Sequence, residues 1–400
     1  MHWVIRTAAA SVASALAACG GVGTGPSGVP AVRSAVATAA DRGAPLPRNV
    51  VRACPPPADP AIAQCLALIR TDAGSHTKFA GYGPSDLRSA YVLPSTTGGI
   101  GQTVAVVDAY DDPKAEKDLA KYRAFYGLSP CSTENSCFRK VNQLGGRKKY
   151  PAASSDWAFE EALDIEMVSA LCPNCSIILV EANNPSPENL AKAADEAVKL
   201  GANVVSNSYI GYGMRGMIEA PHYDHPGVIM TASSGDQGFG ISEPAGFPTV
   251  VSVGGTKLVT GHNPRGWKET VWSLSGSGCE GRQVKPSWQL DAGCTGRTMN
   301  DVAALADPAK GVAVFDSFYG KGWSVGGGTS VGAPLIAAAY ALAGNAATTN
   351  AAESLYAPGA ALWDVTEGSD GQCARAYLCN AGVGYDGPTG NGTPNGVSAF

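Results

Sequence analysis

Two acidic residues with helical spacing are the first candidates for chemistry. Glu160 and Asp164 are four residues apart, so in a helix their carboxyl groups lie on one face, a turn from each other. Met167 and Leu171 continue this face and are apolar, which indicates a covered face rather than an exposed acidic stripe. Two close carboxyl groups titrate as a pair, with one pKa raised. Such a group can serve as a general base in acidic solution.

A serine in a glycine-rich loop is the candidate nucleophile. The run Gly326–Pro334 leads into an apolar stretch, Leu335–Leu342, which is predicted to be a buried helix. Thr329 or Ser330 would cap this helix, where unpaired N–H groups and a partial positive charge favour a developing oxyanion. The alternative interpretation is a capped helix after a flexible turn.

A third acid follows a strand with buried character. The run Ser233–Gly238 reads Ser-Ser-Gly-Asp-Gln-Gly and contains Asp236. Ligand sites lie beyond the carboxyl ends of parallel strands, so Asp236 is placed to face a reacting centre. The alternative is an ordinary turn aspartate between glycines.

Histidine is the usual proton carrier beside a nucleophilic serine, and the chain has five. The contenders are His222 and His225, which flank an aspartate in a loop bounded by proline and glycine. Asp108, at a strand end, could orient either of them. A histidine-dependent, subtilisin-like protease built from Asp108, Ser330 and one of these histidines is therefore an alternative to a carboxylate base.

Taken in order, the Glu160/Asp164 pair, the Ser-Gly-Asp run ending at Asp236 and the Gly-Gly-Thr-Ser run ending at Ser330 resemble the motifs of the sedolisin, or serine-carboxyl peptidase, family. The resemblance covers residues 82–400. It implies a subtilisin-like fold and an endopeptidase most active in acid, in which a glutamate replaces the histidine. By this likeness Ser330 is the nucleophile that forms the acyl-enzyme, and Glu160 is the general base. Asp164 orients Glu160, and Asp236 donates a hydrogen bond in the oxyanion hole.

Some positions depart from that pattern or leave alternatives open. Glu161 is a rival base, although the family's spacing favours Glu160. Gln237 stands where the family commonly has serine, and the stretch 210–215 is idiosyncratic. A non-catalytic surface-binding module on a peptidase scaffold is the alternative from another class. The presence of all four catalytic residue types argues against that alternative.

The C-terminal region is similar to the calcium site of the same family. Two runs carry this likeness, Leu362–Val365 and Gly382–Asp386. Two carboxylates and several backbone carbonyls supply the all-oxygen shell that Ca²⁺ prefers, so the likeness implies one structural Ca²⁺. The implied ligands are Asp364 and Asp386, with the carbonyls of Val365, Gly382 and Gly384. The alternative is a pair of loop aspartates near glycine turns.

Strands that alternate with helices must position these residues. β-branched runs predict strands at 103–107, 176–180, 204–208, 227–232 and 250–253. Helices are predicted at 86–91, 113–126, 157–171 and 187–200, the last capped by Ser186. The alternation favours an α/β fold with a mostly parallel central sheet, helices on both faces and a single large catalytic domain.

The N-terminal part carries an export signal. A weakly apolar, alanine-rich stretch after Arg6 predicts a signal peptide over residues 1–18. The residues around Cys19 resemble a lipoprotein box, so either Cys19 is lipidated and anchors the chain to a membrane, or ordinary cleavage follows an alanine. Residues 19–80 are rich in Gly, Pro and Ala and are predicted to be a linker or short pro-segment. The peptidase domain is predicted over 81–400.

The cysteines support export. There are eleven, and ten fall into close pairs in the sequence. Such pairs favour disulfides formed in an oxidising compartment. The pair Cys172/Cys175 could instead be a redox or zinc motif, although no second CxxC is present. The pairs are Cys54/Cys65, Cys131/Cys137, Cys172/Cys175, Cys279/Cys294 and Cys373/Cys379.

The charge balance limits the partners. The chain has 29 Lys and Arg against 34 Asp and Glu, and the basic residues form no long run. Nucleic-acid binding is therefore not expected. We expect a monomer that acts on polypeptides and is secreted or extracytoplasmic.

Overall fold

The structure is a computed structural model that describes residues 45–72, 81–211, 218–320, 322–350 and 352–400. All of these residues lie in one compact unit. The predicted signal peptide, Cys19 and the stretch 212–215 lie outside the described residues. No helix in the described ranges has both the length and the apolar character needed to span a bilayer.

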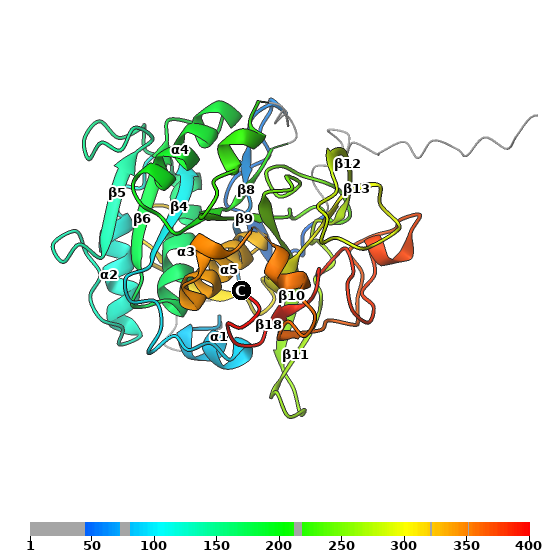
Figure 1. Ribbon diagram of the computed structural model, residues 1–400. Coiled ribbons are helices and arrows are strands. Elements are labelled where there is room, and N and C mark those ends of the chain that lie inside the picture. The colour runs from blue at the N-terminus through cyan, green and yellow to red at the C-terminus, as the bar shows by residue number, and fades with distance from the viewer. Residues whose placement is uncertain (1–44, 73–80, 212–217, 321, 351) are drawn as a thin grey trace, which may run out of the picture. The chain divides into compact units, whose positions relative to one another are not determined.

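The elements follow one another in an alternating order (Figure 1). The α-helices are α1 (Pro84–Tyr91), α2 (Ala115–Phe125), α3 (Ser155–Leu171), α4 (Pro187–Lys199) and α5 (Thr329–Ala343). Short 3₁₀ helices are η2 (Ala220–Tyr223), η3 (Ala346–Thr348), η4 (Glu353–Tyr356) and η5 (Ala376–Leu378). The first strands are β1 (Val50–Arg52), β2 (Gln64–Cys65), β3 (Leu68–Arg70), β4 (Thr103–Ala109), β5 (Phe138–Asn142), β6 (Ser176–Ala182), β7 (Val204–Asn207), β8 (Tyr209–Ile210) and β9 (Ile229–Ser233). The later strands are β10 (Val250–Thr260), β11 (Trp267–Val271), β12 (Gly278–Val284), β13 (Gly296–Met299), β14 (Val302–Leu305), β15 (Val312–Asp316), β16 (Gly322–Gly327), β17 (Leu362–Trp363) and β18 (Thr393–Pro394).

The central sheet is mostly parallel, as predicted. Its strand order is β11-β10-β9-β7-β4-β6-β5, with β14 also paired to β10, and only the β10–β11 pairing is antiparallel. The chain enters this sheet at β4, adds β5 and β6 on one side of it and then β7, β9 and β10 on the other, so β4 and its neighbours form a topological switch point. Ligands bind beyond the carboxyl ends of the strands at such a point.

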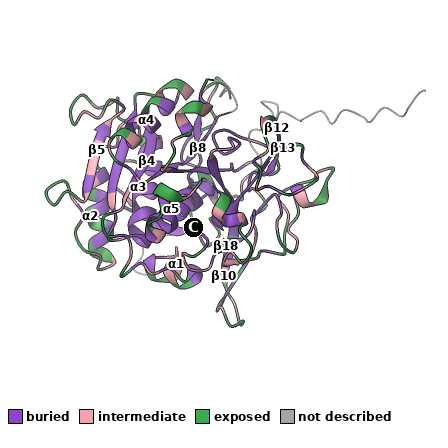
Figure 2. Cartoon of the chain, viewed as in Figure 1, coloured by how far each residue is buried: buried purple, intermediate pink, exposed green. Residues whose placement is uncertain are grey.

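Helices cover both faces of this sheet. α4 packs on β4 and β6, while α3 and α5 pack on each other and on the opposite face (Figure 1). Alternate residues of β4 accordingly enter different cores: Val104 and Val106 join the cluster under α3 and α5, and Ala105 and Val107 join the cluster under α4. Both α3 and α5 are buried along nearly their whole length (Figure 2). Polar side chains on them therefore lie in the protein interior.

Most predicted elements are confirmed, with small shifts at their ends. The strands at 103–107, 176–180, 204–208 and 227–232 correspond to β4, β6, β7 and β9, and the four predicted helices to α1–α4. The predicted strand at 250–253 extends to Thr260 because its second half pairs with β11. Ser186 caps α4, since its hydroxyl accepts a hydrogen bond from the Asn189 N–H at 3.3 Å.

The cap of α5 differs from the prediction. Neither Thr329 nor Ser330 is the N-cap, because α5 begins at Thr329 and Gly328 precedes it with φ of 96°. Only glycine adopts this backbone region at low cost. Ser330 is therefore the second residue of the helix.

Residues 45–72, part of the predicted linker or short pro-segment at 19–80, form paired strands and are not a free linker. β3 pairs with β1 on one side and with β16 on the other, within a four-stranded sheet of order β1-β3-β16-β15. β2 pairs with β8. Strands of two or three residues thus pair this segment with the catalytic domain. Such strands leave little periodic signal, since distant partners stabilise them.

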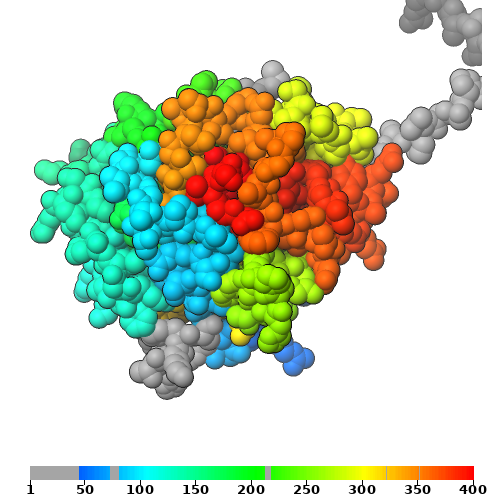
Figure 3. Space-filling view, turned by 60° about the horizontal axis from the view of Figure 1, so that its bottom comes forward, coloured from blue at the N-terminus to red at the C-terminus, as the bar shows by residue number. Residues whose placement is uncertain are grey.

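The disulfide prediction is confirmed. All five expected pairs are bonded, including Cys172 with Cys175 and Cys54 with Cys65. The C-terminus also packs on the body: Phe400 meets Tyr340 of α5 edge to face, and its carbonyl accepts a bond from Asn345. Figure 3 shows the C-terminal residues beside the segment that follows α5.

Candidate active site

Ser330 lies at the start of α5 and is fully buried. Ser330 therefore lies in the first turn of the helix, where the backbone N–H groups have no partner within the helix. Its hydroxyl donates to the carbonyl of Ser208 at 3.4 Å, and Ser208 follows β7 at the switch point. The hydroxyl also hydrogen-bonds the Glu160 carboxyl, and this hydrogen bond lowers the pKa of Glu160. The structure therefore brings the residues at 160 and 330 together.

Glu160 projects from α3 into this buried cluster. Its Oε2 accepts hydrogen bonds from the backbone N–H groups of Leu66 and Ala67, at 2.7 and 2.6 Å. Burial raises the pKa of Glu160 well above its ordinary value, and the nearby Asp108 raises it further. The hydrogen bonds from Ser330 and the two N–H groups lower the same pKa. These donors stabilise a negative charge on Glu160.

Asp164 lies one turn further along α3, beside Glu160. Burial raises its pKa well above the ordinary value, and the charges of Asp108 and Glu160 raise it further, while a hydrogen bond from Ser208 lowers it. Both predicted carboxyls are thus covered, as the apolar continuation of their face indicated.

Asp108 completes this group of acids. It is the second-last residue of β4, and neither of its carboxyl oxygens has a hydrogen-bond partner within the described residues. Burial raises the pKa of Asp108 to about 8. Asp108 therefore holds its proton in acid, and Glu160 is the member of the group with backbone donors that stabilise a negative charge. Sequence reasoning placed Asp108 at a strand end but gave it a histidine partner.

Asp236 lies beside the start of α5. Its Oδ1 accepts bonds from the backbone N–H and the hydroxyl of Thr329, at 2.9 and 2.8 Å. Its Oδ2 is buried without a partner in the described part of the chain. Burial raises the pKa of Asp236 to about 6, against the lowering effect of Thr329 and of the Arg52 charge. In acid the proton lies on Oδ2, which is free to donate.

The Asp236 backbone also contacts Gln237, the residue that stands where the sedolisin family commonly has serine. Its N–H donates to Oε1 of Gln237 at 3.1 Å. Gln237 thereby fixes the turn that carries Asp236.

The residues that were alternatives to Glu160 as the base have other neighbours. Glu161 is fully buried, but the groups that raise its pKa after burial are Glu181, Asp112 and Asp108. His222 and His225 both bond the carboxylate of Asp195 on α4, at 2.7 and 3.1 Å. This geometry favours Glu160 as the partner of the serine.

Gly328 brings the pieces of the site close together. A Cβ at this position would lie 2.6 Å from Oδ2 of Asp236 and would overlap the carbonyl oxygen of Leu66. The backbone of residue 66 therefore approaches the start of α5 as closely as glycine permits. Sequence reasoning missed Leu66 and Ala67 here, because a segment assigned to a linker gave no reason to seek backbone donors.

The predicted calcium ligands also gather in one place. The Gly384 N–H donates to Oδ2 of Asp364 at 2.9 Å, and the Gly382 N–H donates to Oδ2 of Asp386 at 3.0 Å. Burial raises the pKa of Asp386 to about 6, and the charge of Asp364 is among the groups that raise it. The carbonyl of Val365 accepts no hydrogen bond among the described residues, and the same holds for Gly382 and Gly384. Adjacent carboxylates and free carbonyls fit Ca²⁺.

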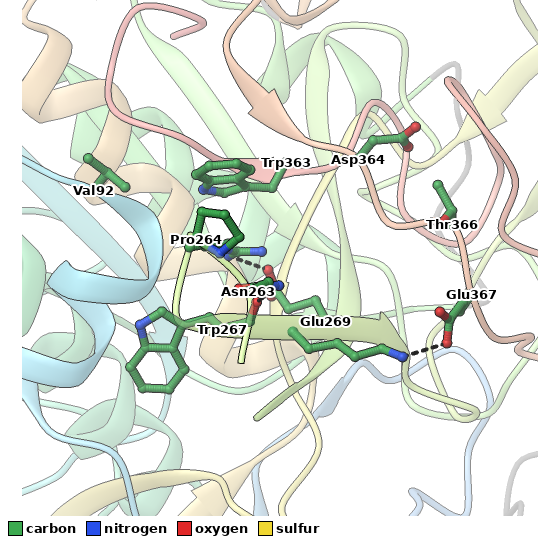
Figure 4. Close-up of a pocket in the computed structure, with 11 residues that line it drawn as sticks. Val92, Asn263, Pro264, Trp267, Glu269, Trp363, Asp364, Thr366 and Glu367 are labelled. Atoms are coloured by element: carbon green, nitrogen blue, oxygen red, sulfur yellow. Dashed lines mark hydrogen bonds and ion pairs between the residues drawn. The ribbon is translucent and has the colours of Figure 1, made fainter. Parts of the chain in front are cut away.

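A surface pocket of about 600 Å³ adjoins this region. Figure 4 shows Trp363 and Asp364 on one side of it and Asn263 and Glu269 on another. Arg265, which also lines it, lies over the ring of Trp363 at 5.0 Å and pairs with Glu269. None of the catalytic candidates lines this pocket.

Comparison with known proteins identifies relatives of the chain. It is 31% identical to kumamolisin of Bacillus sp. (strain MN-32) over 364 residues, covering 79% of this chain and 62% of the relative. It is 23% identical to sedolisin of Pseudomonas sp. (strain 101) over 360 residues, covering 78% and 60%. The chain thus spans less than two thirds of the length of these relatives. No family model matches it.

Solved structures show the same fold. The structure of Pseudomonas sedolisin, a serine-carboxyl proteinase complexed with two molecules of pseudo-iodotyrostatin, matches with a TM-score of 0.66 and 23% identity. The match covers 79% of this chain and 95% of that one. Sphericase matches with a TM-score of 0.52 and 17% identity, over 79% of this chain and 98% of that one. This likeness shows a subtilisin-like fold, and the sequence relatives indicate the sedolisin family.

Proposed function

We propose that the protein is an exported serine-carboxyl endopeptidase that hydrolyses peptide bonds through an acyl-enzyme on Ser330. The observation that carries the proposal is the pairing of the buried Ser330 hydroxyl with the Glu160 carboxyl at the switch point. The likeness to kumamolisin and sedolisin supports the reaction class.

Glu160 acts as the general base. It takes the proton of the Ser330 hydroxyl while the oxygen attacks the substrate carbonyl carbon. It then gives this proton to the leaving amine as the peptide C–N bond breaks. In the second half of the reaction Glu160 takes a proton from water, whose oxygen attacks the acyl ester, and returns it to the serine oxygen. One water molecule is consumed for each bond cut.

Asp164 and Asp108 lie beside Glu160 and leave the charge of the group to it by staying protonated. Both lack the backbone N–H donors that Glu160 has, and burial raises both pKa values. Each therefore stays protonated in acid and adds no repelling charge beside the base. Asp164 orients Glu160, because the two side chains lie one helical turn apart in the same buried cluster.

Asp236 stabilises the tetrahedral intermediate. With Oδ1 held by Thr329, the protonated Oδ2 can donate to the oxyanion beside Gly328. An ionised Asp236 would repel the oxyanion. Since burial raises the pKa of Asp236 to about 6, the donor is present in acid and is lost near neutrality. This supports an acidic optimum.

We also propose that one Ca²⁺ binds at the C-terminal site and braces its loops. Asp364, Asp386 and the carbonyls of Val365, Gly382 and Gly384 would hold it. The gathered carboxylates and free carbonyls support this assignment. When bound, the ion supplies structural charge compensation and no chemistry at Ser330.

The compartment is part of the proposal. The five disulfides support an oxidising, extracytoplasmic location. Whether Cys19 carries a lipid is decided by the mass of the mature N-terminus: a diacylated Cys19 supports anchoring, and an unmodified N-terminus supports free secretion.

The activity is tested with casein at about pH 4. Wild-type protein should release peptides, and Ser330→Ala should lose this activity while keeping its thermal transition. The double variant His222→Ala/His225→Ala should retain the activity. Casein cleavage by Ser330→Ala, or loss of cleavage in the histidine variant at unchanged stability, would contradict the proposed mechanism.

A further inference from the structure

The strand β11 lies at one end of the central sheet, and part of its outer edge is unpaired. Within the described residues, β10 is its only neighbouring strand. Leu258 of β10 lies opposite Glu269, and Thr256 lies opposite Val271. The Val271 N–H points away from β10, because it donates to the carbonyl of Glu367 at 2.9 Å. Alternate residues of a strand present their N–H and C=O groups to the same side, so those of Glu269 also point outward.

The backbone of Glu269 is open while its side chain is closed. The whole residue is 8% exposed and its side chain 1%, so the exposed atoms belong to the main chain. The carboxylate accepts hydrogen bonds of 2.6 to 3.2 Å from Tyr91, Thr256, Arg265 and Thr393. In the described part of the chain, no hydrogen bond uses the outward N–H or carbonyl of Glu269. Glu269 thus offers one main-chain donor and one acceptor at a fixed place.

Glu269 lines the surface pocket of about 600 Å³. Figure 4 shows Trp363, from β17, across the pocket from Glu269. Arg265 lies over the Trp363 ring at 5.0 Å and donates both to Glu269 and to the carbonyl of Ala90. The walls are therefore held in place by the protein itself. A preformed pocket loses little conformational freedom when a ligand binds.

An exposed apolar side chain also lines this pocket. Val92 is 54% exposed and has φ of 54° at the C-cap of α1. A β-branched residue rarely adopts this backbone region, which costs energy. Apolar walls beside an open main-chain donor and acceptor suit an extended peptide. Such a peptide adds to a sheet edge and places alternate side chains in the pocket.

The charges of the pocket do not select a charged ligand. Arg265 pairs with Glu269 at 2.6 Å, and Lys268 pairs with Glu367 at 2.8 Å. A lysine on an edge strand discourages pairing with another chain, but the charge of Lys268 is compensated here. The open groups have the spacing of a strand, and this favours a neutral, extended segment of polypeptide over other ligands.

A short stretch of chain joins this pocket to the catalytic centre. β11 ends at Val271, and the carbonyl of Leu274 accepts a hydrogen bond from the Gly238 N–H at 2.9 Å. Gly238 belongs to the turn that carries Asp236. Glu269 and Leu274 are five positions apart, which is at most about 18 Å of chain. A substrate of protein length can therefore occupy both places at once.

We propose that β11 and the pocket beside it form a second binding site for polypeptide substrates. An extended segment, remote from the bond that is cut, pairs with the main chain of Glu269 and rests a side chain against Trp363. This inference rests on the proposed peptidase function. No bond is made or broken at this site, and the proposal does not draw on calcium, although Asp364 lines the same pocket. The enzyme should thus bind long, unfolded chains more tightly than short peptides.

Thr366→Trp tests the site by filling it. Thr366 is exposed and lines the pocket. KM for casein at about pH 4 should rise about tenfold, because two main-chain hydrogen bonds and an apolar contact are lost, while kcat stays unchanged. KM for a four-residue peptide should not change, because a peptide of at most about 14 Å is taken up by the catalytic centre alone.

Two variants serve as controls. Thr366→Ser leaves the pocket open and should keep the wild-type KM for casein. Thr96→Trp adds the same ring at an exposed position that does not line the pocket, and it should also keep the wild-type KM. The thermal transition of each variant should match that of the wild type. An unchanged KM for casein in Thr366→Trp would overturn the inference.

Hydrogen exchange gives a readout that needs no catalysis. In the Ser330→Ala chain, casein at ten times its Kd should slow exchange of the Glu269 amide about tenfold. Thr366→Trp, added to the same chain, should abolish this protection. Absence of protection in Ser330→Ala would overturn the inference. Protection by the neutral sugar chitotetraose and not by casein would also overturn it, in favour of a carbohydrate site.

These measurements separate the inference from the function it rests on. If wild-type protein cleaves casein and the four-residue peptide, and Thr366→Trp behaves as the wild type does, the inference is wrong and the peptidase function stands. If wild-type protein cleaves neither substrate, the proposed function is wrong, and the inference with it.

Discussion

Asp236 sets the upper pH limit of the proposed enzyme, and Asp236→Asn tests this directly. The carboxyl must carry a proton on Oδ2 to donate to the oxyanion, because Thr329 occupies Oδ1. Burial raises the pKa of Asp236 to about 6, so its proton is lost as the pH rises through that value. An asparagine has a similar shape and keeps an N–H donor at every pH.

The size of the effect follows from this pKa. A group with a pKa of about 6 is about nine-tenths protonated at pH 5 and about one-tenth protonated at pH 7. The activity of the wild-type enzyme should therefore fall about tenfold for each pH unit above about 6. Complete loss of an oxyanion donor costs about 10²–10³ in rate, which sets the floor of this decline.

The assay measures kcat/KM of the enzyme on one peptide from about pH 3 to 8. In Asp236→Asn the upper limb should move to higher pH or vanish. Asp156→Asn, which alters a partly exposed carboxyl on α3, should follow the wild-type curve. An upper limb at the wild-type position in Asp236→Asn would refute the assignment of Asp236 as the donor.

Two further predictions concern stability. Burial raises the pKa of Asp112 to about 7 and that of Glu161 well above its ordinary value. Both acids therefore add stability that is fully present below the unfolded pKa of about 4; the part from Asp112 is lost as pH rises through about 7, and the part from Glu161 is lost as pH rises through its own raised pKa. Tm should therefore fall between about pH 5 and 8. Glu161→Gln should flatten this fall, whereas the control Glu188→Gln, at an exposed position, should leave it unchanged. A Tm that rises over this pH range would contradict the reasoning. Removing Ca²⁺ with a chelator should lower Tm by several degrees in the wild type and much less in Asp386→Asn, since a ligand at about 100 times its Kd adds about 2.7 kcal/mol. An unchanged wild-type Tm would argue against the calcium site.

The central sheet could be predicted because its strands carry a strong local signal. β4, β6, β7 and β9 are short runs of apolar, largely β-branched residues, buried on both faces, and they alternate with helices of clear periodicity. The covered position of Glu160 and Asp164 was also predictable, because the residues that continue their face along α3 are apolar.

The segment that crosses the site could not be predicted in the same way. β1, β2 and β3 have two or three residues each. β1 pairs with β3, while the other partners, β8 for β2 and β16 for β3, lie far along the chain. Pairing over such distances leaves no periodic pattern in the segment itself. The Cys54/Cys65 pair and the apolar run around Leu66 were the available signals, and they indicated order rather than a linker.

The role of Asp108 was hidden for a related reason. Its position at the end of β4 is readable from the sequence, but its neighbours come from α3 and depend on how α3 packs on the sheet. The N-cap of α5 likewise depends on the positive φ of Gly328, which lets Leu66 approach. Both features arise from tertiary packing and not from local preference.

The most direct test of a carboxylate base is kcat/KM of Glu160→Gln at about pH 4, compared with that of the wild type. Glutamine keeps the shape of the side chain but cannot take the serine proton. The mechanism predicts a loss of about 10²–10⁴ at an unchanged thermal transition. Wild-type activity in this variant would show that another group moves the proton.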